Sequence, residues 1–104
     1  MLDYSPSELA DHLKTQQPLL LDVREPWEFD ICHIPGSKLI PMRQIPEWAN
    51  TADPDQPVAV ICHHGIRSRQ VGIYLEHLGF RQVINLASGV DGWAREVDPQ
   101  MATY

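Results

Sequence analysis

Cys62 is the residue whose setting points most directly to chemistry. It follows an apolar run at residues 58–61 and precedes the segment His63-His64-Gly65-Ile66-Arg67-Ser68, after which a helical pattern begins. A thiol at a strand-to-helix turn faces main-chain N–H groups and the positive end of the helix dipole, which favour thiolate over thiol. The same turn forms a pocket for an anion that is bonded to the sulfur or attacked by it. The sequence therefore predicts a nucleophilic Cys62.

The residues after Cys62 are the candidate substrate-binding group. Their main-chain N–H groups are expected to hold a negatively charged atom, as an oxyanion hole holds oxygen. Arg67 either contacts the bound anion or pairs with a carboxylate such as Asp22. Ser68 either bonds the sulfur or caps the next helix, and capping is the expected role. The group comprises His63, His64, Gly65, Ile66, Arg67 and Ser68.

The two imidazoles of this loop are expected to lie in solvent, with only their backbone amides used. Positions 63 to 66 hold no Lys or Arg. Electrostatic help for an anionic donor would then come from Arg67, from the helix dipole and from any protonated histidine.

Asp22 and Arg24 are expected to support the loop without taking part in chemistry. Asp22 ends the apolar run that begins at Leu19, and Arg24 follows two residues later. In an open parallel sheet, ligands bind beyond the carboxyl ends of the strands. Because Cys62 also follows a strand, both fragments point to the same edge of the sheet.

A thiolate in this setting supports group transfer of sulfur. It attacks the outer sulfur of a donor and leaves a persulfide on Cys62, with the second sulfur about 2 Å beyond the first. The loop N–H groups would hold the charged terminal sulfur, and a thiolate or cyanide acceptor would remove it. Cys62 is the only covalent residue in this ping-pong scheme.

The elements that must position these residues alternate between strands and helices. A helix is expected to start at Pro6, with Ser5 as N-cap and Glu8 completing a capping box. Such alternation predicts an α/β fold with a mostly parallel central sheet flanked by helices on both faces. Strands are expected at residues 19–23, 38–40, 58–62 and 83–87, with further helices at 27–31, 43–50 and 68–78 and a short one carrying Trp93.

The helix at 68–78 has the clearest pattern. Val71, Tyr74, Leu75 and Leu78 follow the spacing of a buried stripe, and Gly79 suits the position after the helix.

Length and composition predict one ordinary domain over residues 1–104. The formal net charge of -6 argues against nonspecific binding to nucleic acid or to an anionic membrane. Two cysteines do not form a disulfide framework, and no segment resembles a signal peptide or a membrane span. The cytoplasm, where thiols stay reduced, is the expected compartment.

Four fragments in order resemble the rhodanese-like domain family, and the match covers nearly the whole chain. The first is Asp22-Val23-Arg24-Glu25, similar to D-x-R-E, and the second is His33-Ile34-Pro35-Gly36-Ser37, similar to H-I-P-G-A. Residues 62–68 resemble the active loop C-x-x-x-x-R-S, and residues 89–93 with 97–99 resemble a G-x-x-x-W…DP signature. Cys32 and Ser88 depart from the family pattern, both outside the active loop.

The resemblance implies a sulfurtransferase that works through a Cys62 persulfide, with thiosulfate or another sulfane-sulfur compound as donor. It implies no cofactor. In this superfamily the six-residue loop from Cys62 to Arg67 resembles sulfurtransferases, whereas a loop one residue longer resembles phosphatases. Phosphatase or arsenate reductase activity is therefore the weaker alternative. A stronger one is a relay module that exchanges persulfide sulfur with a partner protein.

The remaining candidates have simpler interpretations. Cys32 is expected to be a small apolar filler, because nothing in the sequence brings it near Cys62. The pairs Cys32-His33 and Cys62-His63 lack the usual spacing of zinc ligands, so no metal site is expected. The three tryptophans are expected to serve in packing.

Overall fold

A parallel sheet of five strands forms the centre of the computed structural model, which describes residues 1–104. Every strand pair in the sheet is parallel. The spatial order is β1 (Leu2–Tyr4), β5 (Val83–Leu86), β4 (Val58–Ile61), β2 (Leu19–Asp22) and β3 (Lys38–Leu39). The predicted α/β class with a parallel sheet is confirmed, and the loop after the central strand β4 is the one that begins with Cys62.

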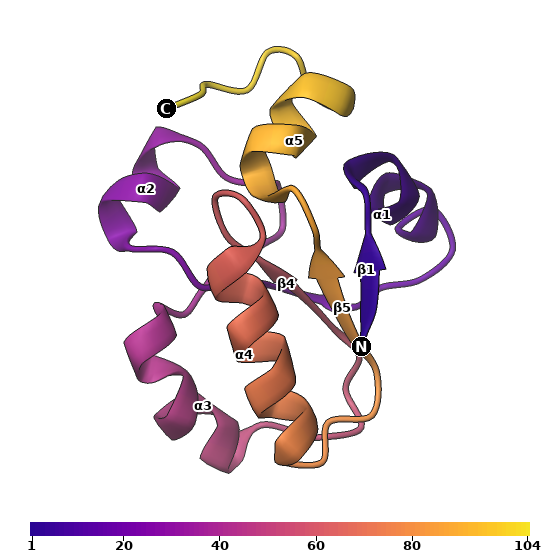
Figure 1. The fold of residues 1–104 in the computed structure, drawn as a ribbon, viewed down its shortest axis with the longest axis vertical. Helices are drawn as coiled ribbons and strands as arrows, with labels where there is room; N and C mark the ends of the chain where they lie inside the picture. Colours follow the sequence, from indigo (N-terminus) through magenta and orange to yellow (C-terminus); the bar gives the residue numbers. More distant parts are fainter.

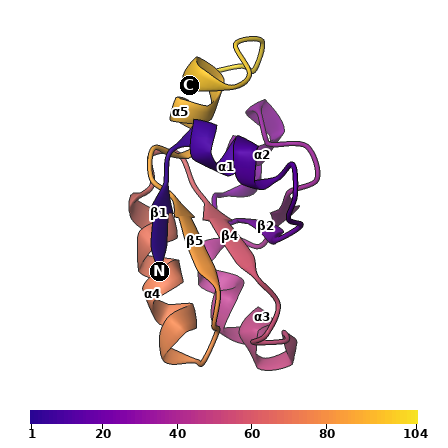
Figure 2. The ribbon, with the colours of Figure 1, turned by 90° about the vertical axis from the view of Figure 1, so that its right-hand side faces the viewer.

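Helices cover both faces of the sheet, as predicted. Figure 1 shows α4 running along one face with α3 beside it, and Figure 2 shows α1 on the opposite side. The helices are α1 (Pro6–His12), α2 (Pro26–Ile31), α3 (Ile45–Thr51), α4 (Ile66–His77) and α5 (Gly89–Glu96), and a 3-10 turn, η1 (Met42–Gln44), precedes α3. None of them is long and apolar enough to cross a membrane.

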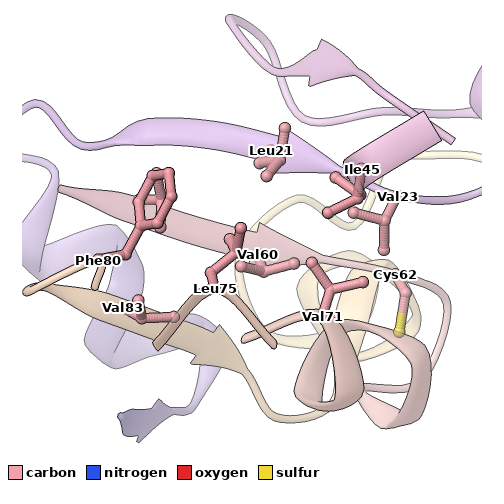
Figure 3. Packing of buried hydrophobic residues seen from close by; sticks show 10 residues of the cluster. Leu21, Val23, Ile45, Val60, Cys62, Val71, Leu75, Phe80 and Val83 are labelled. Carbon is pink, nitrogen blue, oxygen red and sulfur yellow. The ribbon is translucent and has the colours of Figure 1, made fainter. Parts of the chain in front are cut away.

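Alternation along the strands divides the core between the two faces, because successive side chains of a strand point to opposite sides. On one face, Val58 and Val60 of β4 pack with Val71 and Leu75 of α4 (Figure 3). Cys62 ends this row, so its side chain lies on the α4 face. The opposite face joins residues of β4 and β5 to α1 and α5.

The helix ends follow local sequence signals closely. Ser5 and Glu8 form the predicted capping box at α1. Gly79 has a φ of +97°, and its N–H donates to the carbonyl of Glu76 while that of Phe80 donates to Leu75. This is a Schellman motif, which satisfies the last carbonyls of α4.

The start of α4 differs from the prediction. The helix begins at Ile66 with Gly65 as N-cap, and Ser68 lies one turn inside it. The expectation that Ser68 caps the helix is therefore wrong. The buried face also begins earlier, at Ser68, and continues through Val71, Gly72 and Leu75.

The predicted stripe of α4 is accordingly only half correct. Tyr74 and Leu78 are 38% and 47% exposed, whereas Val71 and Leu75 are buried. The apolar residues of α4 occur on two faces, and tertiary packing selects the face that contains the small residues Ser68 and Gly72.

Candidate active site

Two main-chain N–H groups converge on the Cys62 sulfur. The N–H of Gly65 lies 3.1 Å from Sγ, and that of Ser68 lies 3.3 Å away. The thiol itself donates to Ser68 Oγ at 3.2 Å. The loop therefore has the predicted arrangement, with amides directed at one sulfur, and Ser68 takes the role of sulfur partner instead of helix cap.

The sulfur is covered in this structure. Cys62 is only 1% exposed, and Ser68 beside it is fully buried. The structure therefore combines a converging set of amides with a closed approach to the thiol. Direct access to Sγ is therefore restricted in this conformation.

Glycine is required at Gly65 for two reasons. Its φ is +96°, in the left-handed region that side chains rarely adopt. A Cβ there would also collide with the carbonyl oxygen of Ala87. The positive φ turns the chain from the loop into α4 and directs the Gly65 N–H at the sulfur.

The start of α5 holds the other side of the loop. The N–H of Val90 donates to the carbonyl of Cys62 at 2.9 Å, and that of Asp91 donates to His63 at 3.1 Å. Gly89 has a φ of +63°, and a Cβ there would collide with those two carbonyls. The first residues of the G-x-x-x-W fragment therefore hold the backbone of Cys62 and His63 in place.

Four loop N–H groups have no hydrogen-bond partner within the chain, those of His63, His64, Ile66 and Arg67. Because Gly65 and Ser68 already bind Sγ, these four are the donors left for a ligand. Unsatisfied N–H groups at a helix start form a binding site for negative charge.

Arg67 pairs with a carboxylate, which was one of its two predicted roles, but the carboxylate belongs to Glu28 and the suggested partner Asp22 is wrong. Its two terminal nitrogens lie 2.8 and 2.9 Å from the two carboxylate oxygens, in a bidentate pair. The Arg67 guanidinium is the main cause that lowers the pKa of Glu28 to about 2. Glu28 likewise raises the pKa of Arg67. The pair joins α2 to the start of α4.

Asp22 is unavailable to Arg67 because Arg24 occupies it. Arg24 Nε lies 2.9 and 3.1 Å from the two carboxylate oxygens of Asp22, and Nη2 lies 2.7 Å from Oδ2. Both side chains are fully buried. Arg24 also donates to the carbonyls of Glu28 and Cys32.

Asp22 and Arg24, the two residues predicted to support the loop, have no direct contact with it through hydrogen bonds. Neither forms a hydrogen bond with residues 62–68, and the connection runs through Glu28 and Tyr104. Sequence reasoning missed Glu28. Its spacing to Glu25 signals a capping box, which α2 contains, but does not indicate the arginine that it binds.

His63 is not the exposed loop side chain that was predicted. Its ring stacks on Tyr104, with centroids 3.8 Å apart, and also contacts His64 at 3.9 Å. Burial, followed by the proximity of His64, lowers the pKa of His63. Its imidazole is therefore harder to protonate than a free imidazole, which reduces the positive charge it can offer to an anion. The His64 side chain is 57% exposed, as expected, and lies 3.7 Å from Asp91.

Tyr104 is the second residue that sequence reasoning missed. Its hydroxyl accepts from Arg24 Nη1 at 2.9 Å and donates to Glu28 Oε1 at 3.0 Å. Cys32 is partly buried and lines a small hollow together with His63 and Tyr104, so it lies closer to the loop than expected. No three His, Cys, Asp or Glu side chains are arranged to hold a metal ion.

Comparisons with known proteins show which family this chain resembles. The rhodanese-like domain family matches residues 5–96. Thiosulfate sulfurtransferase GlpE of Pseudomonas syringae pv. syringae is 37% identical over 95 residues, which cover 91% of this chain and 89% of that protein. The crystal structure of a rhodanese-like domain protein from Staphylococcus aureus has a TM-score of 0.82 and 30% identity, covering 100% of this chain and 99% of that one.

Two longer relatives contain a similar segment. The chloroplastic rhodanese-like/PpiC domain-containing protein 12 of Arabidopsis thaliana is 38% identical over 102 residues, covering 94% of this chain. The probable adenylyltransferase/sulfurtransferase MoeZ of Mycobacterium tuberculosis is 35% identical over 103 residues, covering 96% of this chain. The chain spans 34% and 26% of these two proteins. Taken with the match over residues 5–96, these findings establish that the chain belongs to the rhodanese-like domain family.

Proposed function

We propose that the protein is a sulfurtransferase that carries sulfane sulfur as a persulfide on Cys62, with residues 1–104 acting as one domain. The observation that carries this proposal is the convergence of the Gly65 and Ser68 N–H groups on Sγ. Donors fixed in this way stabilise negative charge on sulfur without further reorganisation. The single-domain relatives named thiosulfate sulfurtransferases support the same activity.

The reaction has two balanced half-reactions. The Cys62 thiolate attacks the outer sulfur of thiosulfate, a new S–S bond forms, and sulfite leaves with the electron pair of the broken S–S bond. A thiolate or cyanide then attacks the outer sulfur of the persulfide. The bond to Cys62 breaks, its electron pair returns to Sγ, and the thiolate is restored. No external oxidant or reductant is needed.

The loop has a separate role for each sulfur. Gly65 and Ser68 N–H groups hold Sγ, whereas the unpaired N–H groups of residues 63, 64, 66 and 67 are available to the outer sulfur or to the departing sulfite. Arg67 is engaged by Glu28, so it shapes the loop and contributes only part of its charge to the anion. We further propose a reducing compartment such as the cytoplasm, because Cys62 acts as a free thiol.

Mass spectrometry of the intact protein tests this function. Incubation with thiosulfate should add the mass of one sulfur atom, and cyanide should remove it. Cys62→Ser should abolish the uptake, whereas Cys32→Ser should retain it. Uptake that persists in Cys62→Ser, or no uptake by the original protein, would overturn the proposal.

A protein donor or acceptor is the second candidate. Cys62 is covered, residues 63–66 carry no Lys or Arg, and Ile66 of the same loop is 70% exposed. These features fit a partner surface better than a small dianion. Turnover from thiosulfate to cyanide should be compared with transfer from a persulfidated protein. Efficient transfer from the protein alone would favour the relay.

A further inference from the structure

Asn85 lies beneath the Cys62 loop and belongs to none of the recognised sequence fragments. It is on β5 and is 2% exposed. In the parallel ladders it pairs with Asp3 on one side and Val60 on the other. The side chain of Asn85 therefore lies on the α4 face of the sheet, between Asp3 and the row that ends at Cys62.

The hydrogen bonds of Asn85 have only one consistent direction. Its Nδ2 lies 3.0 Å from Asp3 Oδ1 and 3.3 Å from the carbonyl oxygen of Gly65, and both of these only accept. The amide oxygen must then face Ser68. At 2.5 Å, the Ser68 hydroxyl donates to Asn85 Oδ1. The two acceptors bound by the Asn85 NH2 group therefore fix the orientation of the amide, and the amide oxygen in turn fixes the direction of the Ser68 hydroxyl proton.

The orientation of the Ser68 hydroxyl determines whether the Cys62 sulfur faces a proton or a lone pair. Because the Ser68 proton is directed at Asn85, a lone pair of Ser68 Oγ faces the sulfur and accepts the thiol proton at 3.2 Å. Hydrogen bonding of this kind favours the neutral form of an acid. A thiolate would face that lone pair until the hydroxyl turned toward sulfur, and the turn would leave Asn85 Oδ1 buried without a donor.

We propose that Asn85 is a positioning residue that orients the Ser68 hydroxyl away from the sulfur and thereby restrains thiolate formation at Cys62. The inference rests on the proposed function of Cys62 as nucleophile. Loading with sulfur would then require the hydroxyl to change partners from Asn85 to sulfur. The Gly65 and Ser68 amides favour the thiolate, so the two effects oppose each other.

Charged and titratable groups around the loop also influence the ionisation of Cys62. His63 and His64 belong to the loop, Arg67 pairs with Glu28 of α2, and Asp91 extends from α5. Two further charges, Arg69 of α4 and Asp3 of β1, pair at 2.7 Å. Asn85→Leu keeps all of these residues but removes the hydrogen bond from Asn85 Nδ2 to Asp3, which is the main cause that lowers the pKa of Asp3. The Ser68→Ala background described next controls for this second effect, because the loss of the Asp3 hydrogen bond does not act through Ser68.

The test measures the rate of Cys62 alkylation by iodoacetamide against pH in a Cys32→Ser background. Asn85→Leu frees the Ser68 hydroxyl, so the midpoint of the profile should fall by about 0.5 to 1 pH unit. In a Ser68→Ala background, Asn85→Leu should shift the midpoint by much less. A change that acts through the backbone of Gly65 would persist without Ser68 and would overturn the proposal, as would an upward shift.

A measurement on the protein with Asn85 intact keeps the proposal testable if Asn85→Leu does not fold. The side-chain amide NMR signals of Asn85 should shift with the alkylation midpoint of Cys62, because Oδ1 loses its donor when the thiolate forms. In Ser68→Ala they should not follow that midpoint. Signals that stay unchanged across the midpoint in the original protein would overturn the inference. Neither readout uses sulfur transfer, so failure of the proposed function would be seen separately.

Discussion

At the scale of single residues, the loop depends on a backbone conformation that only glycine adopts without strain. Gly65 and Gly79 flank the same helix with nearly equal φ values, +96° and +97°. Their surroundings differ. A Cβ at position 65 would collide with Ala87, whereas a Cβ at position 79 would meet no other atom within 4 Å. The two positions separate the cost of a positive φ from that of a collision.

Gly65→Ala should therefore destabilise the protein more than Gly79→Ala and should also prevent sulfur uptake. The control variant, Gly79→Ala, should lower the free energy of unfolding by about 1 to 2 kcal/mol, the cost of a left-handed conformation for a residue with a Cβ. Urea denaturation and intact mass after thiosulfate treatment measure both effects. Equal losses of stability with unchanged uptake would show that the loop tolerates the extra carbon.

Residue-scale prediction succeeded where a local pattern determines the geometry. The strand-to-helix turn placed amides around Cys62, because the turn itself is built from consecutive residues. The suggested partner of Arg67 was wrong because Glu28 comes from a distant segment, and the preferred role of Ser68 as helix cap was wrong because α4 begins earlier, with Gly65 as N-cap. Asp22 is a plausible partner for Arg67 by sequence, but its carboxylate binds Arg24, two residues away. No local sequence signal indicates that Ser68 forms a hydrogen bond with Asn85.

At the scale of elements, the Arg67–Glu28 pair joins α2 to α4 next to the site. The Glu28 carboxylate is almost fully buried, and its pKa is lowered to about 2. A lowered folded-state pKa stabilises the protein above the unfolded value near 4.5, and this contribution is lost as pH falls through 2. Glu28→Gln should cost about 2 to 3 kcal/mol at pH 7.

The cost of Glu28→Gln should shrink as pH falls from 5 toward 2, as measured by urea denaturation at several pH values. Glu25→Gln is the matched control, because Glu25 pairs with Arg43 at 2.7 Å but both side chains are largely exposed. It should lose less than about 1 kcal/mol. A cost for Glu28→Gln that does not change with pH would contradict the assignment of the shift to this pair.

Element boundaries were predictable where caps and apolar runs are present. The capping box of α1, the strands β2, β4 and β5, and the Gly79 stop all follow from short-range signals. Strand β1 was missed because its three residues, Leu2–Tyr4, carry no pattern of their own. Pairing with β5 alone makes that segment a strand.

At the scale of the whole molecule, the last residue, Tyr104, contacts residues of the site that lie far from it in the sequence. Tyr104 bridges Arg24 and Glu28 and covers the ring of His63. Burial raises the pKa of Tyr104 to about 12. A raised folded-state pKa gives stability that is complete below the unfolded value near 10 and is lost as pH rises through 12.

Tyr104→Phe should remove that alkaline loss of stability and, by removing the hydroxyl bridge, cost about 1 to 2 kcal/mol at neutral pH. Denaturation at pH 7 to 11 measures both. Tyr74→Phe, at an exposed position of α4, should change stability by less than about 0.5 kcal/mol. A Tyr104→Phe profile that stays parallel to that of the original protein up to pH 11 would contradict the raised pKa.

The charge of the whole molecule determines how an anionic donor approaches. The net charge is -6, and the arginines around the loop are paired with carboxylates, Arg67 with Glu28, Arg69 with Asp3 and Arg95 with Asp91. Local positive charge is therefore largely cancelled, and the remaining long-range field repels a dianion such as thiosulfate. Added salt screens that repulsion.

The rate of sulfur loading from thiosulfate should consequently rise a few-fold as the potassium chloride concentration increases from about 0.02 to 0.5 M. Alkylation of Cys62 by neutral iodoacetamide, measured in the Cys32→Ser background, should change far less, which separates screening from an effect of salt on the thiol itself. A loading rate that falls with salt would show the reverse balance, in which Arg67 and the helix dipole attract the donor more strongly than the acidic surface repels it.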